Sequence, residues 1–285
     1  MNILNKILIT LFCLLTPIGL FSKEKYKLSV CAIFQNESEY LKEWIDYHRK
    51  VGVDHFYLYN NNSTDDYKKV LEPYIKKRIV ELYEWPSVQE ENDWSNFSFN
   101  IQPKVYNDAL KRSKSKSKWL AIIDTDEFIV PVCEKNIVDV LEKHYGWVSG
   151  LCVNWQCYGT SYVKKVLPGE MLKKLILKMR EDHPRNIYYK SIVRPSHVLQ
   201  NPNPHYCIYL EGYCHVNTNY EPIVIENTGI YIDKIRINHY WTRDEWFLEN
   251  VKIPRYEKWG ISADAIRNSV EEMNQIEDGI IIQYL

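Results

Sequence analysis

A short apolar run followed by two closely spaced carboxylates constrains this chain more than any other feature. Residues 119–123 are continuously apolar, which indicates a buried strand, and Asp124 and Asp126 follow directly. Open parallel sheets bind ligands beyond the carboxyl ends of their strands, where paired carboxylates can hold a hard divalent cation. The pair therefore predicts a Mn²⁺ or Mg²⁺ site that would in turn hold a diphosphate. The alternative is a plain turn or a helix N-cap, which the tripeptide alone does not exclude.

The first half of the chain alternates predicted strands and helices. Apolar runs predict strands over residues 26–34, 55–59 and 79–83. Helical spacing of apolar residues predicts helices over residues 37–51, 67–74 and 102–113. The first helix has Asn36 as its predicted N-cap, Glu39 as the partner in a capping box, and Gly52 as its closing residue. The alternation predicts an α/β fold with a mainly parallel sheet flanked by helices.

The second half is less regular, and we expect it to form a smaller mixed part. Its patterns predict a helix over residues 137–144 and strands over 150–158, 190–194 and 236–241. A further helix follows residues 242–245, and the end of the chain is expected to be helical over 263–273 and then loose. These patterns indicate one domain over residues 27–260 and a C-terminal helical tail over 261–285.

Residues 1–22 differ in kind from the rest of the chain. Lys6 precedes an apolar stretch over residues 7–21, as in a secretory signal peptide or an uncleaved signal anchor. The protein is therefore expected to be exported or membrane-anchored, with the side of the membrane left open. The seven cysteines form no Cys-x-x-Cys pair, which argues against a zinc site. A disulfide between Cys207 and Cys214 is conceivable in an exported domain.

Charge and composition exclude other classes of partner. The net charge of −1 gives no electrostatic reason to bind nucleic acid. The basic run over residues 111–118 is interpreted as a solvated helix end rather than a phosphate- or membrane-binding patch. No glycine-rich phosphate loop is present, so a bound phosphate must be held by a metal and by side chains. His48 falls on the apolar face of its helix, and we expect it to be a packed residue.

Several short motifs together resemble those of the family 92 glycosyltransferases. They occur in order between about Lys27 and Trp259: residues 31–37 (CAIFQNE), 43–48 (EWIDYH), 59–65 (YNNNSTD), 107–110 (NDAL), 124–128 (DTDEF) and 238–241 (NHYW). The resemblance implies a GT-A fold, which is Rossmann-like, with the mixed part on the acceptor side. It also implies a nucleotide-sugar donor, with a UDP-sugar favoured, a divalent metal at Asp-x-Asp, and inversion at the anomeric carbon. Relatives of this kind suggest galactose as the sugar, and a glycan or another hydroxyl compound as the acceptor.

Candidate site residues follow from the strand ends and from the resemblance. Asp126 is the stronger candidate for direct metal ligation, Asp124 is expected to bind metal or ribose, and His239 is the third candidate ligand. Candidates for the nucleoside are Phe34, Asn36, Glu37, Asn61, Asp65, Gln102 and Asn107. Lys190 or Arg194 would neutralise the diphosphate. The base that inversion requires is sought among Glu211, Asp244 and Glu245.

Two other functions compete with this interpretation. Residues 122–126 also resemble the nucleophile strand of a haloacid-dehalogenase-type phosphatase, in which the first aspartate forms a phospho-enzyme. That family has Thr or Val at the position of Phe128. Its acidic metal partners lie downstream of the nucleophile, whereas Asp65 and Asp66 lie upstream here. A non-catalytic carbohydrate-binding relative is the second alternative, and the intact aspartate pair argues against it.

Overall fold

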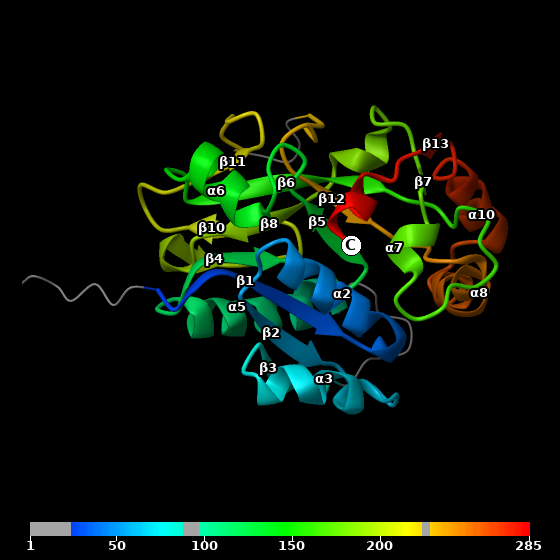
Figure 1. Cartoon of the computed structure of the whole chain (residues 1–285), viewed down its shortest axis with the longest axis horizontal. Coiled ribbons are helices and arrows are strands. Elements are labelled where there is room, and N and C mark those ends of the chain that lie inside the picture. Colours follow the sequence, from blue (N-terminus) through cyan, green and yellow to red (C-terminus); the bar gives the residue numbers. More distant parts are fainter. Residues whose placement is uncertain (1–23, 88–96, 224–228) are drawn as a thin grey trace, which may run out of the picture.

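The computed structural model describes residues 24–87, 97–223 and 229–285. A nine-stranded sheet forms its centre, in the order β3-β2-β1-β4-β8-β6-β12-β5, with β11 paired to β6 (Figure 1). Its strands are β1 (Tyr26–Phe34), β2 (His55–Asn60), β3 (Val80–Glu84), β4 (Ser117–Ile122), β5 (Glu127–Val130), β6 (Gly150–Cys157), β8 (Tyr189–Val193), β11 (His215–Asn217) and β12 (Arg236–His239). Two small sheets pair β9 (Val198–Gln200) with β10 (Ile208–Tyr209) and β7 (Leu177–Lys178) with β13 (Ile276–Glu277).

Helices connect and cover these strands. The α-helices are α2 (Ser38–Lys50), α3 (Tyr67–Lys76), α5 (Gln102–Ser113), α6 (Ile137–Tyr145), α7 (Met171–Lys174), α8 (Glu245–Phe247), α9 (Ile253–Glu257) and α10 (Ala263–Glu271). Shorter helical turns of the π or 3₁₀ type are η1 (Phe97–Ile101), η2 (Pro184–Ile187), η3 (Pro195–His197), η4 (Leu248–Lys252) and η5 (Ile280–Tyr284). The predicted α/β class, with a mainly parallel sheet between helices, is confirmed.

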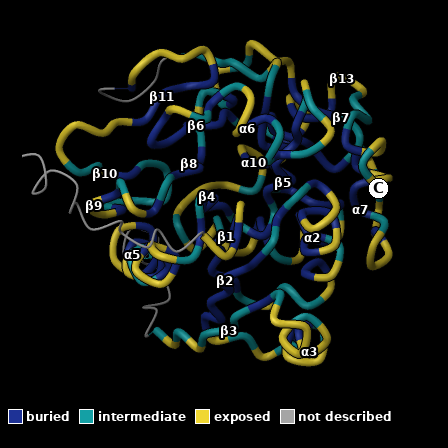
Figure 2. Tube along the Cα trace, turned by 60° about the vertical axis from the view of Figure 1, so that its left-hand side comes forward, coloured by how far each residue is buried: buried dark blue, intermediate teal, exposed yellow. Residues whose placement is uncertain are grey.

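Strands β3, β2, β1 and β4 are all parallel, as the alternation of strands and helices predicts. Alternate residues of β1 face opposite layers, because side chains in a strand alternate between its two sides. Val30 packs in one core with α2, α3 and α6, whereas Cys31 packs in the other core with α5. Figure 2 shows the buried strands between helices whose outer faces are exposed. Because β3, β2, β1 and β4 run in the same direction, their carboxyl ends lie at one edge of the sheet.

Strand β5 was not predicted, and it determines what lies beside the aspartate pair. It begins directly after Asp126 and runs antiparallel to β12, with Glu127 opposite His239 and Phe128 opposite Asn238. Strand β12 also pairs in parallel with β6. Four residues after a polar turn are too few to give a clear periodic signal. This pairing brings His239, from the second half of the chain, next to the end of β4.

The predicted capping box at the start of α2 is wrong. Glu37 is the N-cap and no side chain caps the helix, while Asn36 has a left-handed φ of 57°. The Asn36 side chain instead accepts a hydrogen bond from the backbone N–H of Thr64 at 2.8 Å. The residue therefore joins the turn after β1 to the turn after β2. Gly52 ends the helix with a φ of 105°, as predicted.

The last residues of the chain are packed rather than loose. Ile281 is fully buried in the main core, and the Tyr284 hydroxyl donates a hydrogen bond to the Pro131 carbonyl at 2.9 Å. Asp278 accepts one from buried Arg236 at 2.8 Å. The end of the chain therefore adds Ile281 to the core and packs against Pro131 and Arg236, while Ile282 and Leu285 stay exposed.

The leader prediction for residues 1–22 lies outside the described residues. Within the described ranges, no helix combines the length and apolar character needed to cross a membrane. Cys207 is buried and Cys214 is exposed, and both are free thiols, so the disulfide considered between them is not formed. His48 is fully buried, as predicted.

Candidate active site

A cavity of about 760 Å³ opens at the carboxyl ends of the parallel strands. Its walls come from the ends of β1 and β2, the turn after β4, β8, β12 and the segment that follows β12. The predicted site residues that line it are Phe34, Glu37, Asn61, Gln102, Asp124, Asp126, Lys190 and His239. The fold therefore brings most of the nucleoside and metal candidates to one place.

Asp126 has the environment expected of a metal ligand. Its Oδ1 lies 3.6 Å from Nε2 of His239, and its Oδ2 lies 3.3 Å from Nζ of Lys252. Its backbone carbonyl accepts a hydrogen bond from Tyr240 N–H at 2.8 Å, which fixes the turn against β12. Burial opposes ionisation, but Lys252 and then His239 hold the pKa of Asp126 well below its usual range. The carboxylate is therefore ionised and faces the cavity.

The negative charge of Asp124 is neutralised by a lysine side chain of the protein. Its Oδ2 accepts a hydrogen bond from Nζ of Lys190 at 2.7 Å, and its Oδ1 lies 3.3 Å from the hydroxyl of Tyr106. The Lys190 side chain is 1% exposed and that of Asp124 is 31% exposed, so a buried cation holds a carboxylate that reaches the cavity. Burial alone would lower the pKa of Lys190, but Asp124 and Glu127 raise it. Asp124 thus has a cationic partner in Lys190, as Asp126 has in Lys252.

Glu127 is a site residue that the sequence interpretation missed. It is fully buried, and its Oε2 accepts a hydrogen bond from the backbone N–H of Asp124 at 2.8 Å. Burial raises the pKa of this carboxyl well above its usual range. Its position directly after the aspartate pair was the available signal. Glu127 and Lys190 together hold the turn that presents the two aspartates.

Three nucleoside candidates do not line the cavity. Asn36 binds Thr64 as described above, Asp65 accepts a hydrogen bond from Ser38 N–H at 2.7 Å, and Asn107 donates one to the Asn201 carbonyl at 2.8 Å. Each of these side chains stabilises a turn or an inter-element contact. They support the walls of the site without reaching its interior.

The three candidate bases also lie outside this cavity, within the described part of the chain. Glu211 is exposed in the turn after β10. Asp244 is buried as the N-cap of α8 and accepts hydrogen bonds from Phe247 N–H at 2.8 Å and Val166 N–H at 2.7 Å. Glu245 is the first residue of the same helix. Arg194 likewise lies elsewhere, where its guanidinium donates to the carbonyls of Val148 and Gly146.

The segment after β12 supplies residues that sequence reasoning did not assign. Lys252, Arg255 and Trp241 line the cavity from this segment. Arg243 is buried, forms an ion pair with Glu37, and stacks 3.5 Å from the centre of the Tyr40 ring. Burial raises the pKa of Glu37, and Arg243 opposes that shift. These contacts join the end of β1 to the end of β12, far apart in sequence.

The residues present fit a divalent cation in part. No group of three His, Cys, Asp or Glu residues in the described ranges forms a ready-made metal cluster. Asp126 and His239 nevertheless converge at one wall of the cavity, where the carboxylate suits Mn²⁺ or Mg²⁺ and the imidazole suits a transition-metal ion better than Mg²⁺. Oxygen atoms of a bound ligand and water would have to complete the coordination.

The family model for glycosyltransferase family 92 matches residues 25–269. This chain belongs to glycosyltransferase family 92. A family 92 protein of Ricinus communis is 26% identical over 218 residues, or 73% of this chain and 36% of the relative. A beta-1,4-galactosyltransferase of Caenorhabditis elegans is 25% identical over 184 residues, or 61% of this chain and 41% of that protein.

The family 92 assignment removes the phosphatase alternative, because it accounts for most of the chain as one unit. The chain spans about a third of the length of the Ricinus relative it matches. Among solved structures, S. aureus TarS residues 1–349 is similar at 14% identity and a TM-score of 0.42, covering 86% of this chain and 70% of that one.

Proposed function

We propose that this chain transfers a sugar from a UDP-sugar donor to a hydroxyl group of a glycan, with Mn²⁺ or Mg²⁺ bound at Asp126 and His239. The observation that carries the proposal is a single cavity that joins this pair to the ends of β1 and β2. The nucleoside would lie at those strand ends and the diphosphate at Asp126. Membership of family 92 supports the same assignment.

The nucleoside end of the cavity offers an unsatisfied acceptor. The amide nitrogen of Asn61 donates to the carbonyl of Trp85 at 2.9 Å and to Oγ of Ser87 at 2.7 Å. Its Oδ1 is buried and has no hydrogen-bond partner among the described residues. A buried acceptor without a partner is costly, and the imide N–H of uracil would satisfy it. This acceptor is compatible with the uracil of a uridine nucleotide.

The diphosphate end offers positive charge and metal ligands. A bound cation would act as a Lewis acid and stabilise the leaving nucleoside diphosphate. Lys252 lies 3.3 Å from Asp126 and lines the cavity, so it would contribute to the same neutralisation. Lys190 holds Asp124 in place and keeps the turn in the shape that presents Asp126.

The transferred sugar is proposed to be galactose, and the reaction to proceed with inversion. The name of the Caenorhabditis relative specifies a beta-1,4-galactosyltransferase. UDP-galactose carries an α bond at its anomeric carbon, so a β product requires one displacement with inversion. The acceptor hydroxyl then needs a base. The described carboxylates that line the cavity are Glu37, Asp124 and Asp126, and of these Glu37 lies outside the aspartate turn.

Calorimetric titration of UDP, with and without Mn²⁺, tests the donor and metal parts of this proposal. We expect UDP binding that is lost with EDTA and restored by Mn²⁺, and that is weakened at least about tenfold by Asp126→Asn or His239→Gln. Asp46→Asn, which changes an exposed aspartate paired with Lys42, is the matched control and should bind like the wild type. Equal UDP affinity in all four proteins would refute the metal assignment. Turnover of UDP-galactose then separates an enzyme from a carbohydrate-binding relative.

A further inference from the structure

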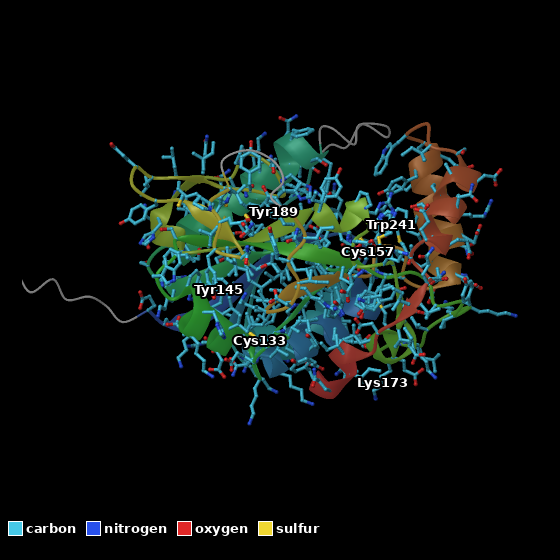
Figure 3. The ribbon with its side chains drawn as sticks, turned by 90° about the horizontal axis from the view of Figure 1, so that it is seen from above. Cys133, Tyr145, Cys157, Lys173, Tyr189 and Trp241 are labelled. Atoms are coloured by element: carbon cyan, nitrogen blue, oxygen red, sulfur yellow. The ribbon has the colours of Figure 1, made fainter. Side chains whose placement is uncertain are left out.

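We propose that a second cavity, beside the first, is the acceptor subsite and binds the terminal pyranose of a glycan by stacking on aromatic rings. This inference rests on the proposed function. The second cavity has a volume of about 260 Å³. Four residues line both cavities: Trp155, His239, Trp241 and Tyr256. In Figure 3, Trp241 and Cys157 lie near one another beside the C-terminal helices, and both line this cavity.

Its position suits the sugar that receives the transferred residue. The cavity shares the His239 end of the first cavity and none of its nucleoside residues, such as Phe34 and Asn61. A subsite reached past His239 and Trp155 would supply the acceptor hydroxyl without displacing the nucleotide.

The walls suit the face of a sugar ring. The Trp155 ring lies 5.5 Å from that of Tyr188 and 4.3 Å from that of His239, between centroids. Trp241 donates its indole N–H to the Tyr256 hydroxyl at 2.9 Å, which fixes both rings. One face of a pyranose carries C–H groups, and these are attracted to the negative face of an aromatic ring. A pocket with this many rings around a narrow space favours such stacking.

Polar groups at the same walls distinguish a sugar from an aliphatic ligand. The Trp155 indole N–H and the His239 Nδ1 are buried without hydrogen-bond partners in the described part of the chain. Arg185 lines the cavity, where its guanidinium donates to Oγ of Ser269 at 2.8 Å. A few polar groups in an otherwise apolar pocket set the orientation of a ligand. Hydroxyl groups of a sugar can pair with the lining Arg185 and Ser269 side chains, whereas a hydrocarbon cannot.

Tyr188 gives the sharpest test, because it lines the second cavity but not the first. Its side chain is 52% exposed, so its replacement should leave the fold intact. Saturation-transfer NMR would measure the binding of methyl β-galactoside and methyl β-glucoside to protein loaded with UDP and Mn²⁺. We expect Tyr188→Ala to weaken pyranoside binding about tenfold, and Tyr188→Phe, which keeps the ring, to stay within about threefold of the wild type.

Tyr213→Ala is the matched control, because Tyr213 is 44% exposed, stacks on His197, and lines neither cavity. It should bind pyranosides like the wild type. Three results overturn the inference: no pyranoside binding by the wild type, equal binding in Tyr188→Ala, or stronger binding of cyclohexanol than of either pyranoside. UDP binding is measured in the same samples. If UDP still binds and any of these three results is found, the acceptor subsite alone is refuted. If the wild type does not bind UDP, the donor site itself is refuted.

Discussion

Two aspartates separated by a single residue occupy different environments in this fold. Asp124 pairs with Lys190, whose side chain is 1% exposed, whereas Asp126 faces Lys252 and His239 at the wall of the cavity. Because Lys190 is buried, breaking its pair with Asp124 would leave an uncompensated cation inside the fold. Both aspartates line the cavity, with Asp124 held by Lys190 and Asp126 in contact with Lys252 and His239.

Removal of the buried cation should destabilise the whole domain. We expect Lys190→Met to lower the free energy of unfolding by about 3–5 kcal/mol, because Asp124 and buried Glu127 lose their common partner. Urea unfolding followed by circular dichroism would measure it. Addition of Glu127→Gln to Lys190→Met should recover part of the loss. Lys42→Met, at an exposed ion pair, should change stability by no more than about 0.5 kcal/mol, and an equal loss there would contradict the argument.

Glu37 is predicted to accept the proton of the acceptor hydroxyl. Because burial raises its pKa above the usual range of a carboxyl, activity should fall on the acidic side as Glu37 becomes protonated. In Glu37→Gln, kcat should fall at least about a hundredfold and the acidic limb of the pH–rate profile should disappear. A variant that keeps the limb and only raises the KM for the donor would instead make Glu37 a nucleoside contact.

At the scale of elements, side chains of helix α2 fix the position of strand β5, which follows the aspartate pair. Trp44 donates its indole N–H to the Glu127 carbonyl at 2.8 Å, and the Tyr47 hydroxyl donates to the Ile129 carbonyl at 2.9 Å. His48 donates from Nδ1 to the Trp44 carbonyl at 2.8 Å and accepts from Ile129 N–H through Nε2 at 3.3 Å. The neutral tautomer is therefore required, because a protonated ring has no acceptor nitrogen.

Burial lowers the pKa of His48 to about 3, which makes stability depend on pH. The folded pKa lies below the unfolded value of about 6.5, so between the two the unfolded chain binds a proton that the folded chain does not. Stability is therefore fully present above about pH 6.5 and is lost as the pH falls. This residue should contribute a loss of about 2 kcal/mol between pH 6.5 and 5.

Denaturant unfolding at several pH values would measure that contribution. His48→Gln should flatten the decline in stability over this range, because an amide can donate and accept without titrating. The matched control is His144→Gln, in which a partly exposed histidine near Glu134 is replaced. A decline of the same slope in His48→Gln and the wild type would show that the charge of His48 does not limit stability in acid.

At the scale of the whole molecule, the end of the chain closes the fold around the second half of the sheet. Asp278 binds Arg236 of β12 at 2.8 Å and lies 3.3 Å from Lys178 of β7. The side chains of Arg236 and Lys178 are 5% and 2% exposed, and Asp278 pairs with both, while Glu181 also pairs with Lys178 at 2.8 Å. Residues remote in sequence thereby hold the strand that carries His239.

Loss of that carboxylate should weaken the fold and the site together. We expect Asp278→Ala to lower the free energy of unfolding by about 3 kcal/mol, because it removes the carboxylate paired with buried Arg236 and one of the two paired with buried Lys178. Differential scanning calorimetry would show a lower Tm, and UDP binding should weaken as β12 loosens. Asp182→Ala, at an exposed pair with Arg180, should leave both quantities unchanged. An unchanged Tm in Asp278→Ala would mean that the tail does not hold β12.

The local pattern of residues was enough to predict most strands and helices and the place of the aspartate pair. Burial repeats every second residue in a strand and about every 3.6 residues in a helix, so these elements leave a periodic trace in the sequence. Helix α5 and strand β1 have the predicted bounds for this reason. The family resemblance rested on the same local motifs and is confirmed.

Which side chains reach the cavity was decided by tertiary structure alone. Strand β5 turns the chain back after Asp126, and its pairing with β12 brings in His239, while Lys252 arrives from a segment 126 residues further along. The same packing makes Asp244 a helix cap and leaves Glu211 in an exposed turn. Strand order and burial depend on contacts between residues that are distant in sequence. The local spacing of apolar residues does not predict such contacts. Sequence therefore determined the main helices and parallel strands and the place of the aspartate pair, and only the assembled sheet decided the chemical surroundings of that pair.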